Sequence, residues 1–274
     1  MSERNKPIGI FDSGIGGLTV LHAIGELLPD EDLVYLGDTA RVPYGTKSSE
    51  TVQRYSLENT RFLLSKGVKA VVVACNSASA TSIPKLREVV SSPILGVIEP
   101  GVEEAMRQTT TGKIGVIGTN ATIGSGRYEK LLFDHGAKEV LGNACPLFVP
   151  LAEEGWIDNK VAEDIARIYL KPFMNGEVDT LILGCTHYPL LEKIISKVCG
   201  PDIRLINSAM SVAQKLKTSL EDLGLQKEKS GSAGSRGIRK YYVTDSPKRA
   251  EEVGGRFLNE DIAPHLELAN ITDH

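Results

Sequence analysis

Two short apolar runs that each end in a cysteine constrain the fold of this chain more than any other feature. The first run covers residues 70–74 and ends at Cys75, and the second covers residues 180–184 and ends at Cys185. Runs of valine, isoleucine and leucine that turn polar abruptly are typical of buried parallel strands. Each strand would bring its thiol to the carboxyl edge of a sheet, where open α/β sheets bind ligands.

Strand and helix patterns alternate along the rest of the chain. Further strands are predicted at residues 8–12, 33–38, 94–99, 114–118, 204–207 and 241–245, and helices at 18–28, 50–64, 158–174 and 209–223. Asp158 is expected to cap one helix, Pro29 to end another and Gly67 to follow a third. This alternation predicts the α/β class, with mainly parallel sheets flanked by helices. Residues 225–239 are predicted to form a surface loop.

The sequence also contains an internal similarity between two of its segments. Residues 6–17 are similar to residues 112–124, an offset of about 105, and the two cysteines lie at the similar spacing of 110 (185 − 75). Two related units, each with a later strand that ends in cysteine, predict two similar lobes that face each other across a cleft.

Composition excludes several classes of protein. The 274 residues are 41% hydrophobic, enough for a substantial core, and the net charge of -4 gives no broad attraction for nucleic acid. The apolar runs are far shorter than the roughly 20 residues that cross a bilayer. The first residues lack an apolar signal segment, so a cytoplasmic protein is expected. The four cysteines show neither a disulfide framework nor the spacing of a metal site.

Other polar residues gather near the predicted strand ends. Asp12 ends the first strand and would reach the same edge as the cysteines, although such a residue also often caps a helix. The glycines after it lack the G-x-G-x-x-G spacing of a dinucleotide site. His187 follows Cys185 closely, with Thr186 between them and Pro189 placed to start the next helix, which favours a role in the site.

Five segments together resemble the cofactor-independent aspartate/glutamate racemase family, in particular its glutamate racemases. They are residues 11–17, 42–45, 74–78, 153–155 and 184–189, and the likeness extends over almost the whole chain. Ser77 departs from the family, which usually has threonine there, but a hydroxyl remains.

The resemblance implies a fold, an activity and a set of partners. It implies a first lobe of residues 1–98 and 208–274 and a second of residues 99–207, with the active site between them. It also implies that the chain interconverts L- and D-glutamate, supplying D-glutamate for peptidoglycan. No cofactor and no metal would be needed. Glutamate would be the small-molecule partner, and the protein would form a homodimer.

The resemblance further assigns roles to individual residues. Cys75 and Cys185 are the two acid/base residues, with Asp12 and Glu153 as supporting groups on one side and His187 on the other. The choice of Glu153 over Glu154 rests on the family pattern alone. Asp12, His187 and both cysteines also match substrate-contacting positions, together with Ser13, Pro43, Tyr44, Gly45, Asn76, Ser77, Thr119, Thr122 and Thr186.

The chemistry explains why two thiols would be needed. Inverting an α-carbon removes its proton from one face and returns a proton to the other, which two opposed groups do with little motion. A free thiol is only a few per cent ionised at neutral pH, so each must be activated, for example by a helix N-terminus.

Three alternatives stay open at this point. The first is a sister racemase that acts on aspartate or a hydantoin with the same two thiols. The second is a Cys-His acyl-transfer enzyme that uses Cys185 and His187, which leaves Cys75 without a role. The third is a binding or regulatory protein that keeps the fold without the activity, against which the intact pair of cysteines speaks.

Overall fold

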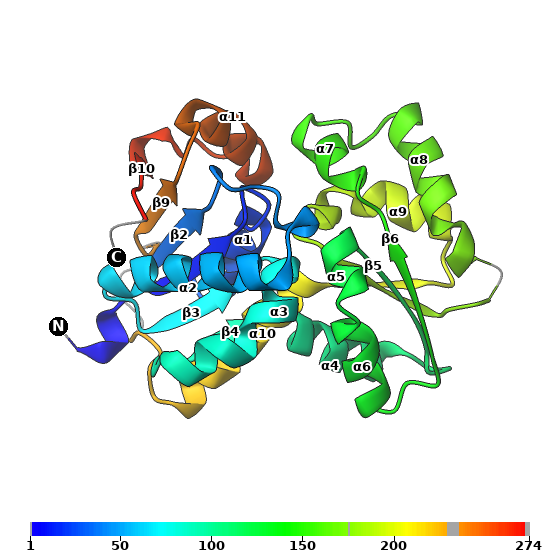
Figure 1. Cartoon of the computed structure of the whole chain (residues 1–274), viewed down its shortest axis with the longest axis horizontal. Coiled ribbons are helices and arrows are strands. Elements are labelled where there is room, and N and C mark those ends of the chain that lie inside the picture. The colour runs from blue at the N-terminus through cyan, green and yellow to red at the C-terminus, as the bar shows by residue number, and fades with distance from the viewer. Residues whose placement is uncertain (1, 175, 229–235, 272–274) are drawn as a thin grey trace.

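The computed structural model describes residues 2–174, 176–228 and 236–271, and within them the chain forms two parallel sheets flanked by helices. Figure 1 shows two lobes side by side, with one sheet in each. The α/β class and the two-lobed arrangement expected from the sequence are confirmed.

The two sheets share one order of strands, which accounts for the internal repeat. Within the described residues, the first sheet has the order β10-β9-β2-β1-β3-β4 and the second the order β6-β5-β7-β8. The segment β2-β1-β3-β4 thus corresponds to the whole second sheet, and the strands before the two cysteines, β3 and β7, occupy equivalent places. The strands cover Ile8–Asp12 (β1), Leu33–Gly37 (β2), Ala70–Val73 (β3), Ile94–Gly96 (β4), Lys113–Gly118 (β5), Glu139–Ala144 (β6), Thr180–Gly184 (β7), Arg204–Asn207 (β8), Arg239–Val243 (β9) and Leu266–Leu268 (β10).

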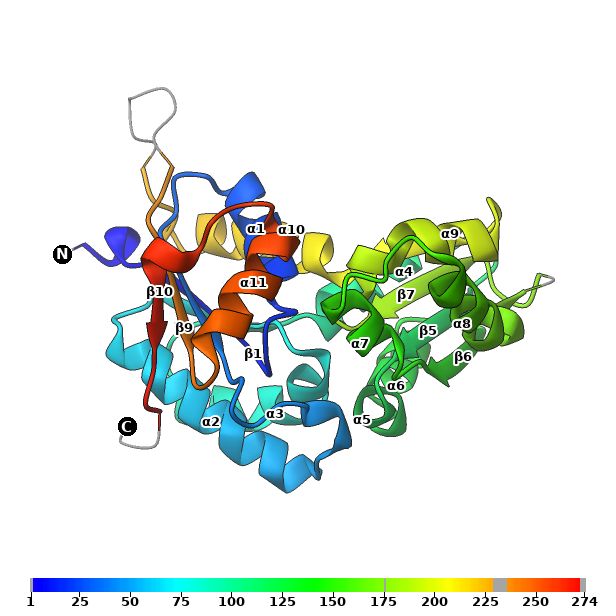
Figure 2. The same cartoon turned by 90° about the horizontal axis from the view of Figure 1, so that it is seen from above.

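The central strands are buried throughout and mostly apolar because helices cover both faces of the sheets. Every residue of β1, β2, β3 and β7 is buried. Ile8 and Ile10 pack into one apolar cluster and Phe11 into another, since successive side chains of a strand point to opposite faces. Figure 2 shows α1 and α10 on one side of the first sheet and α2 and α3 on the other.

The α-helices surround these sheets and are mostly capped by polar side chains or glycine. Ser48 accepts a hydrogen bond from the backbone N–H of Thr51 at the start of α2, and Gly67, with a φ of 74°, follows that helix as predicted. The helices are Leu18–Leu27 (α1), Ser49–Ser65 (α2), Asn76–Val89 (α3), Ile98–Gln108 (α4), Asn120–Gly124 (α5), Arg127–Asp134 (α6), Phe148–Glu153 (α7), Lys160–Leu170 (α8), Glu192–Cys199 (α9), Ser208–Asp222 (α10) and Pro247–Leu258 (α11).

One predicted helix start was wrong. Asn159, not Asp158, caps α8, and its side chain accepts from the backbone N–H of Ala162. Asp158 lies one residue too early and instead forms an ion pair of 2.5 Å with Lys193. The predicted helix 158–174 is α8 followed by one turn of 3-10 helix, Lys171–Phe173.

The chain enters the second lobe through α4 and returns through α10, which packs against both α1 and α4. The strands between residues 113 and 207 all belong to the second sheet, and β9 and β10 extend the first sheet beyond β2. The predicted boundaries between the lobes, 98/99 and 207/208, remain a proposal. This distribution of strands agrees with them.

The predicted loop 225–239 has neither helix nor strand at residues 225–228 and 236–238, and residues 229–235 lie outside the described residues. Arg239, the last residue assigned to the loop, already belongs to β9. No helix in the described part of the chain is long and apolar enough to cross a membrane.

Candidate active site

A cavity of about 240 Å³ lies between the two lobes, and both Cys75 and Cys185 line it. Cys75 precedes α3 and Cys185 follows β7, so each lobe brings one thiol to the carboxyl edge of its sheet. Of the residues predicted to form the site, eleven in all line this cavity: Ser13, Pro43, Tyr44, Gly45, Cys75, Asn76, Ser77, Thr119, Cys185, Thr186 and His187.

The first-lobe wall is buried, and a carboxyl group lies behind it. The Cys75 thiol donates to the Ser13 hydroxyl, with 3.5 Å between sulfur and oxygen. Burial and the nearby Asp12 carboxyl raise the pKa of Cys75 to about 12, against a weaker opposing effect of the backbone N–H of Ala78. Burial also raises the pKa of Asp12, which does not line the cavity and accepts from the backbone N–H of Gly14 at 3.1 Å. The start of α3 is therefore not sufficient to keep this thiol ionised at neutral pH.

The second-lobe wall carries a relay of three side chains. His187 Nδ1 lies 3.8 Å from the sulfur of Cys185, and its Nε2 lies 3.1 Å from Oε1 of Glu153. Burial alone would lower the pKa of His187, but the contacts with Cys185 and Glu153 outweigh it and raise this pKa to about 10. The hydrogen bond from His187 in turn lowers the pKa of Glu153. At neutral pH the relay thus holds an imidazolium between a sulfur and a carboxylate.

This geometry corrects two expectations. Glu153 lies on the side of His187 and not with Asp12, because α7 belongs to the second lobe together with β7. Cys185 is also not followed directly by an α-helix. A 3-10 helix, Tyr188–Leu191, begins after His187, with Pro189 in its first turn as predicted. The two thiols therefore have different surroundings, a buried carboxyl for Cys75 and an imidazole for Cys185.

Hydroxyl and amide groups line the space between the thiols. Ser77 contacts Thr119 at 3.0 Å and Thr122 at 3.3 Å between side-chain oxygens, so Thr122 supports the wall from behind without lining it. Asn76 is 4% exposed, and its Oδ1 accepts from Tyr128 at 2.8 Å. Its Nδ2 has no hydrogen-bond partner among the described residues. An unpaired buried donor beside a cavity is suited to a ligand oxygen.

Among the described residues, neither lysine nor arginine lines the cavity. Arg41, which directly precedes the cavity-lining Val42, is paired with Asp38 and Glu58. The Tyr44 hydroxyl donates to Asp38 and accepts from Asn59, so its single O–H donor is already in use. Anionic groups of a ligand would therefore be held by neutral donors, because both ring nitrogens of His187 already face Cys185 and Glu153.

Among the described residues that line the cavity, sequence reasoning missed six. Three of them adjoin predicted site residues and could have been found from that position alone, whereas the apolar three follow β6, a strand that was not predicted. They are Val42, Thr46 and Asn120 in the first group and Pro146, Val149 and Pro150 in the second.

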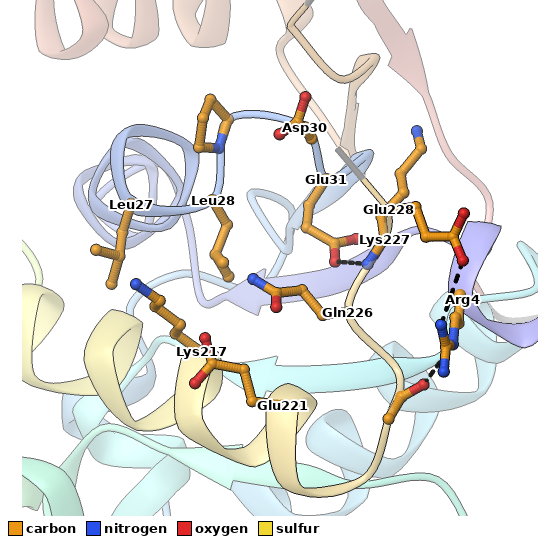
Figure 3. A pocket seen from close by; sticks show the side chains of 12 residues that line it. Arg4, Leu27, Leu28, Asp30, Glu31, Lys217, Glu221, Gln226, Lys227 and Glu228 are labelled. Carbon is orange, nitrogen blue, oxygen red and sulfur yellow. Dashed lines mark hydrogen bonds and ion pairs between the residues drawn. The ribbon is translucent and has the colours of Figure 1, made fainter. Parts of the chain in front are cut away.

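A second cavity, of about 550 Å³, lies at the opposite edge of the first sheet and is lined by residues such as Glu31, Lys217 and Gln226 (Figure 3). None of the predicted site residues lines it. Within the described residues, no group of three or more His, Cys, Asp or Glu side chains is arranged to hold a metal ion.

Known proteins resemble this chain in both sequence and fold. A family model described as Asp/Glu/Hydantoin racemase matches residues 9–216. The chain is 50% identical to the glutamate racemase of Geobacter metallireducens, over 92% of this chain and 93% of the relative. The structure of Francisella tularensis glutamate racemase in complex with D-glutamate has a TM-score of 0.90 at 36% identity, covering 99% of this chain and 100% of that one. Thermus thermophilus glutamate racemase in complex with beta-chloro-D-alanine has a TM-score of 0.89 at 42% identity, with complete coverage of both chains.

The two parallel sheets, the thiol at the carboxyl edge of each and the family match together define the class: the chain belongs to the aspartate, glutamate and hydantoin racemase family. Within this family it is an amino-acid racemase, and the relatives named above are all glutamate racemases.

Proposed function

We propose that this enzyme interconverts L- and D-glutamate with Cys75 and Cys185 as two opposed acid/base residues. The observation that carries the proposal is that both thiols line one cavity from equivalent places in the two lobes. The high identity to glutamate racemases supports glutamate as the substrate.

In one direction, a thiolate on one wall removes the α-proton and becomes a thiol. The thiol on the other wall then gives its proton to the opposite face of the α-carbon and becomes a thiolate. The net reaction inverts the carbon without loss of atoms, and the reverse reaction exchanges the two roles. Before the next turnover in the same direction, each sulfur must recover its starting protonation state.

The groups behind the thiols are suited to this proton movement. His187 can donate to Cys185 while that sulfur is a thiolate, and Glu153 holds the imidazole in the correct orientation. On the other wall, the Asp12 carboxyl and Ser13 hydroxyl can exchange protons with Cys75, whose pKa burial has raised. Asn76, Ser77, Thr119 and Thr186 would hold the substrate carboxylates through neutral donors.

The two-base assignment is tested by Cys75→Ser and Cys185→Ser, with Cys199→Ser as the matched control outside the cavity. We expect each of the first two changes to abolish racemisation, measured as loss of the circular dichroism of D-glutamate, and the control to retain it. Near-normal turnover in either cavity variant would refute the assignment.

The alternatives are tested with the unmodified enzyme. Aspartate and a hydantoin, assayed in the same way, decide between the sister racemases. Entry of solvent deuterium at Cα during turnover, without added cofactor, is expected for proton transfer between two bases.

We also propose that the enzyme acts in the cytoplasm as a cofactor-independent homodimer and that its D-glutamate serves peptidoglycan synthesis. These proposals are supported by the similarity to glutamate racemases over nearly the whole chain.

A further inference from the structure

We infer that helix α11 of the first lobe holds Glu153 of the second lobe in position for His187, and that Arg249 and Arg256 are positioning residues for the acid/base relay at Cys185. The inference rests on the proposed two-base function and deepens it. Figures 1 and 2 both show α11 facing α7 across the gap between the lobes.

Two guanidinium groups reach from α11 to the end of α7. Nη1 of Arg256 donates to the backbone carbonyl of Glu153 at 2.8 Å. Nη2 of Arg249 lies 2.8 Å from Oε1 of Glu154 and 3.8 Å from Oε2 of Glu153. The two arginines are seven residues apart, so they lie on the same face of their helix.

The end of α7 needs such support because the helix is short. It has six residues and finishes at Glu153, where the last carbonyls of a helix lack partners within it. Arg256 supplies a donor for one of these carbonyls. The next turn begins at Gly155, with a φ of 74°, and a Cβ atom there would lie 3.0 Å from Nη1 of Arg256. Glycine thus allows both the turn and the approach of the guanidinium.

The same helix also contacts the imidazole. The ring of Phe257 meets the ring of His187 edge-on, with 5.9 Å between centroids. His187 is 6% exposed, so its ring is fixed by Phe257 on one side and by the hydrogen bond to Glu153 on another. Two of the three contacts of the histidine therefore involve α11, the one with Phe257 directly and the one with Glu153 through the two arginines.

Arg249 has an electrostatic effect as well as a geometric one. The hydrogen bond from His187 lowers the pKa of Glu153 most, and the positive charge of Arg249 adds to this effect. A carboxylate that is held ionised is a better acceptor for the imidazolium. Removing the charge would weaken the partner that orients His187, without touching either thiol.

The test uses the full-length enzyme with Arg249→Gln, Arg256→Gln and the double variant. Arg107→Gln is the matched control, because Arg107 is an exposed helical arginine that contacts only Glu104 among the described residues. The double variant is expected to lower kcat about 10-fold with little change in KM, as removal of a supporting contact behind a site residue commonly does. Arg249→Lys is expected to recover part of the activity that Arg249→Gln loses.

The decisive readout is the primary isotope effect on kcat/KM with α-deuterated L- and D-glutamate. A defect confined to Cys185 makes transfer to that sulfur more rate-limiting. The isotope effect then rises for the enantiomer whose α-proton Cys185 removes and falls for the other. Glu153→Gln is expected to give the same asymmetry in a stronger form.

The inference is overturned if the arginine variants keep kcat within twofold of the unmodified enzyme, or if both isotope effects change equally. It is also overturned if the loss of activity follows only a loss of folded protein in thermal unfolding. Failure of the proposed function looks different, because the unmodified enzyme would then not racemise glutamate, or would do so without one of its cavity cysteines.

Discussion

At the scale of single residues, the two thiols of the cavity have different groups behind them that can activate them. Cys75 has a buried carboxyl behind it, and its pKa is raised to about 12. Cys185 has the imidazole of His187, itself held by Glu153. A symmetric pair of strand ends therefore carries an asymmetric pair of acid/base groups. Each direction of the reaction would begin at a chemically different sulfur.

The charge of His187 can be measured directly. Its pKa, raised to about 10, predicts that the ring stays protonated at pH 8, where an ordinary histidine is neutral. Titration of ¹⁵N-histidine-labelled enzyme by NMR, with His187→Gln to assign the signal among the five histidines, checks this. Because the pKa in the folded state lies above the unfolded value, the stability contributed by this proton is complete below about pH 6.5. It is lost as the pH rises through about 10. A titration midpoint near 6.5 would contradict the predicted relay.

At the scale of elements, continuous apolar runs predicted the central strands well. The runs at β1, β3, β5 and β7 are buried on both faces, and this is the condition under which a strand loses its polar alternation. All four edge strands have one open side, but β4 and β8 contain buried residues and were predicted, whereas β6 and β10 contain none and were not predicted. Their side chains are largely exposed or half-buried and of mixed polarity. A strand without buried side chains has a weaker hydrophobic pattern in its sequence.

Some residues of the candidate site could likewise be predicted from the sequence, and others could not. The two cysteines, Asp12 and His187 were found because they stand at strand ends that the topology brings to one edge. The prediction that Glu153 lies on the same side as Asp12 was wrong. The order of residues in the sequence does not indicate which wall of the cavity a short helix joins. The contacts of Arg249 and Arg256 connect segments that are 95 and 103 positions apart, on different lobes, and no local pattern marks them.

The glycine-rich turn between β1 and α1 is explained by close packing and not by phosphate binding. A Cβ atom on Gly16 would lie 2.4 Å from both Cε1 of His187 and Oγ1 of Thr186. The turn of the first lobe therefore packs directly against the acid/base group of the second. Thr19 supports this contact by donating to the backbone carbonyl of Thr186 at 2.9 Å.

Substitution of Gly16 is expected to impair catalysis through this contact. Gly16→Ala should displace the imidazole and lower kcat/KM about 100-fold, the effect of misplacing a catalytic group by about 1 Å. The overpacking should also cost about 1–3 kcal/mol of unfolding free energy. Gly124→Ala is the matched control, because a Cβ atom there meets nothing within 4 Å. Equal kcat/KM values for the two variants would show that the turn does not position His187.

At the scale of the whole molecule, the two edges of the first sheet have separate roles. The carboxyl edge carries the site, whereas the opposite edge carries a buried ion pair, with 2.5 Å between Nζ of Lys69 and Oε2 of Glu31. The same Nζ donates to the backbone carbonyls of Arg4 and Leu225 at 2.7 and 2.9 Å. One ammonium group thus joins the N-terminal segment, the loop before β2 and the chain that follows α10.

This ion pair lies away from the cavity that Cys75 and Cys185 line. Its loss should therefore lower the stability of the fold without changing catalysis. Lys69→Met leaves the Glu31 carboxylate buried without its cation and is expected to reduce the unfolding free energy by about 3–5 kcal/mol. Urea unfolding followed by circular dichroism measures this loss, while kcat/KM of the folded enzyme should stay unchanged. Adding Glu31→Gln removes the stranded charge but keeps an acceptor for the backbone N–H of Lys227, which bonds to Glu31 at 2.8 Å. The double variant should therefore be more stable than Lys69→Met alone. A single variant as stable as the unmodified protein, or one with impaired turnover, would contradict this separation of roles.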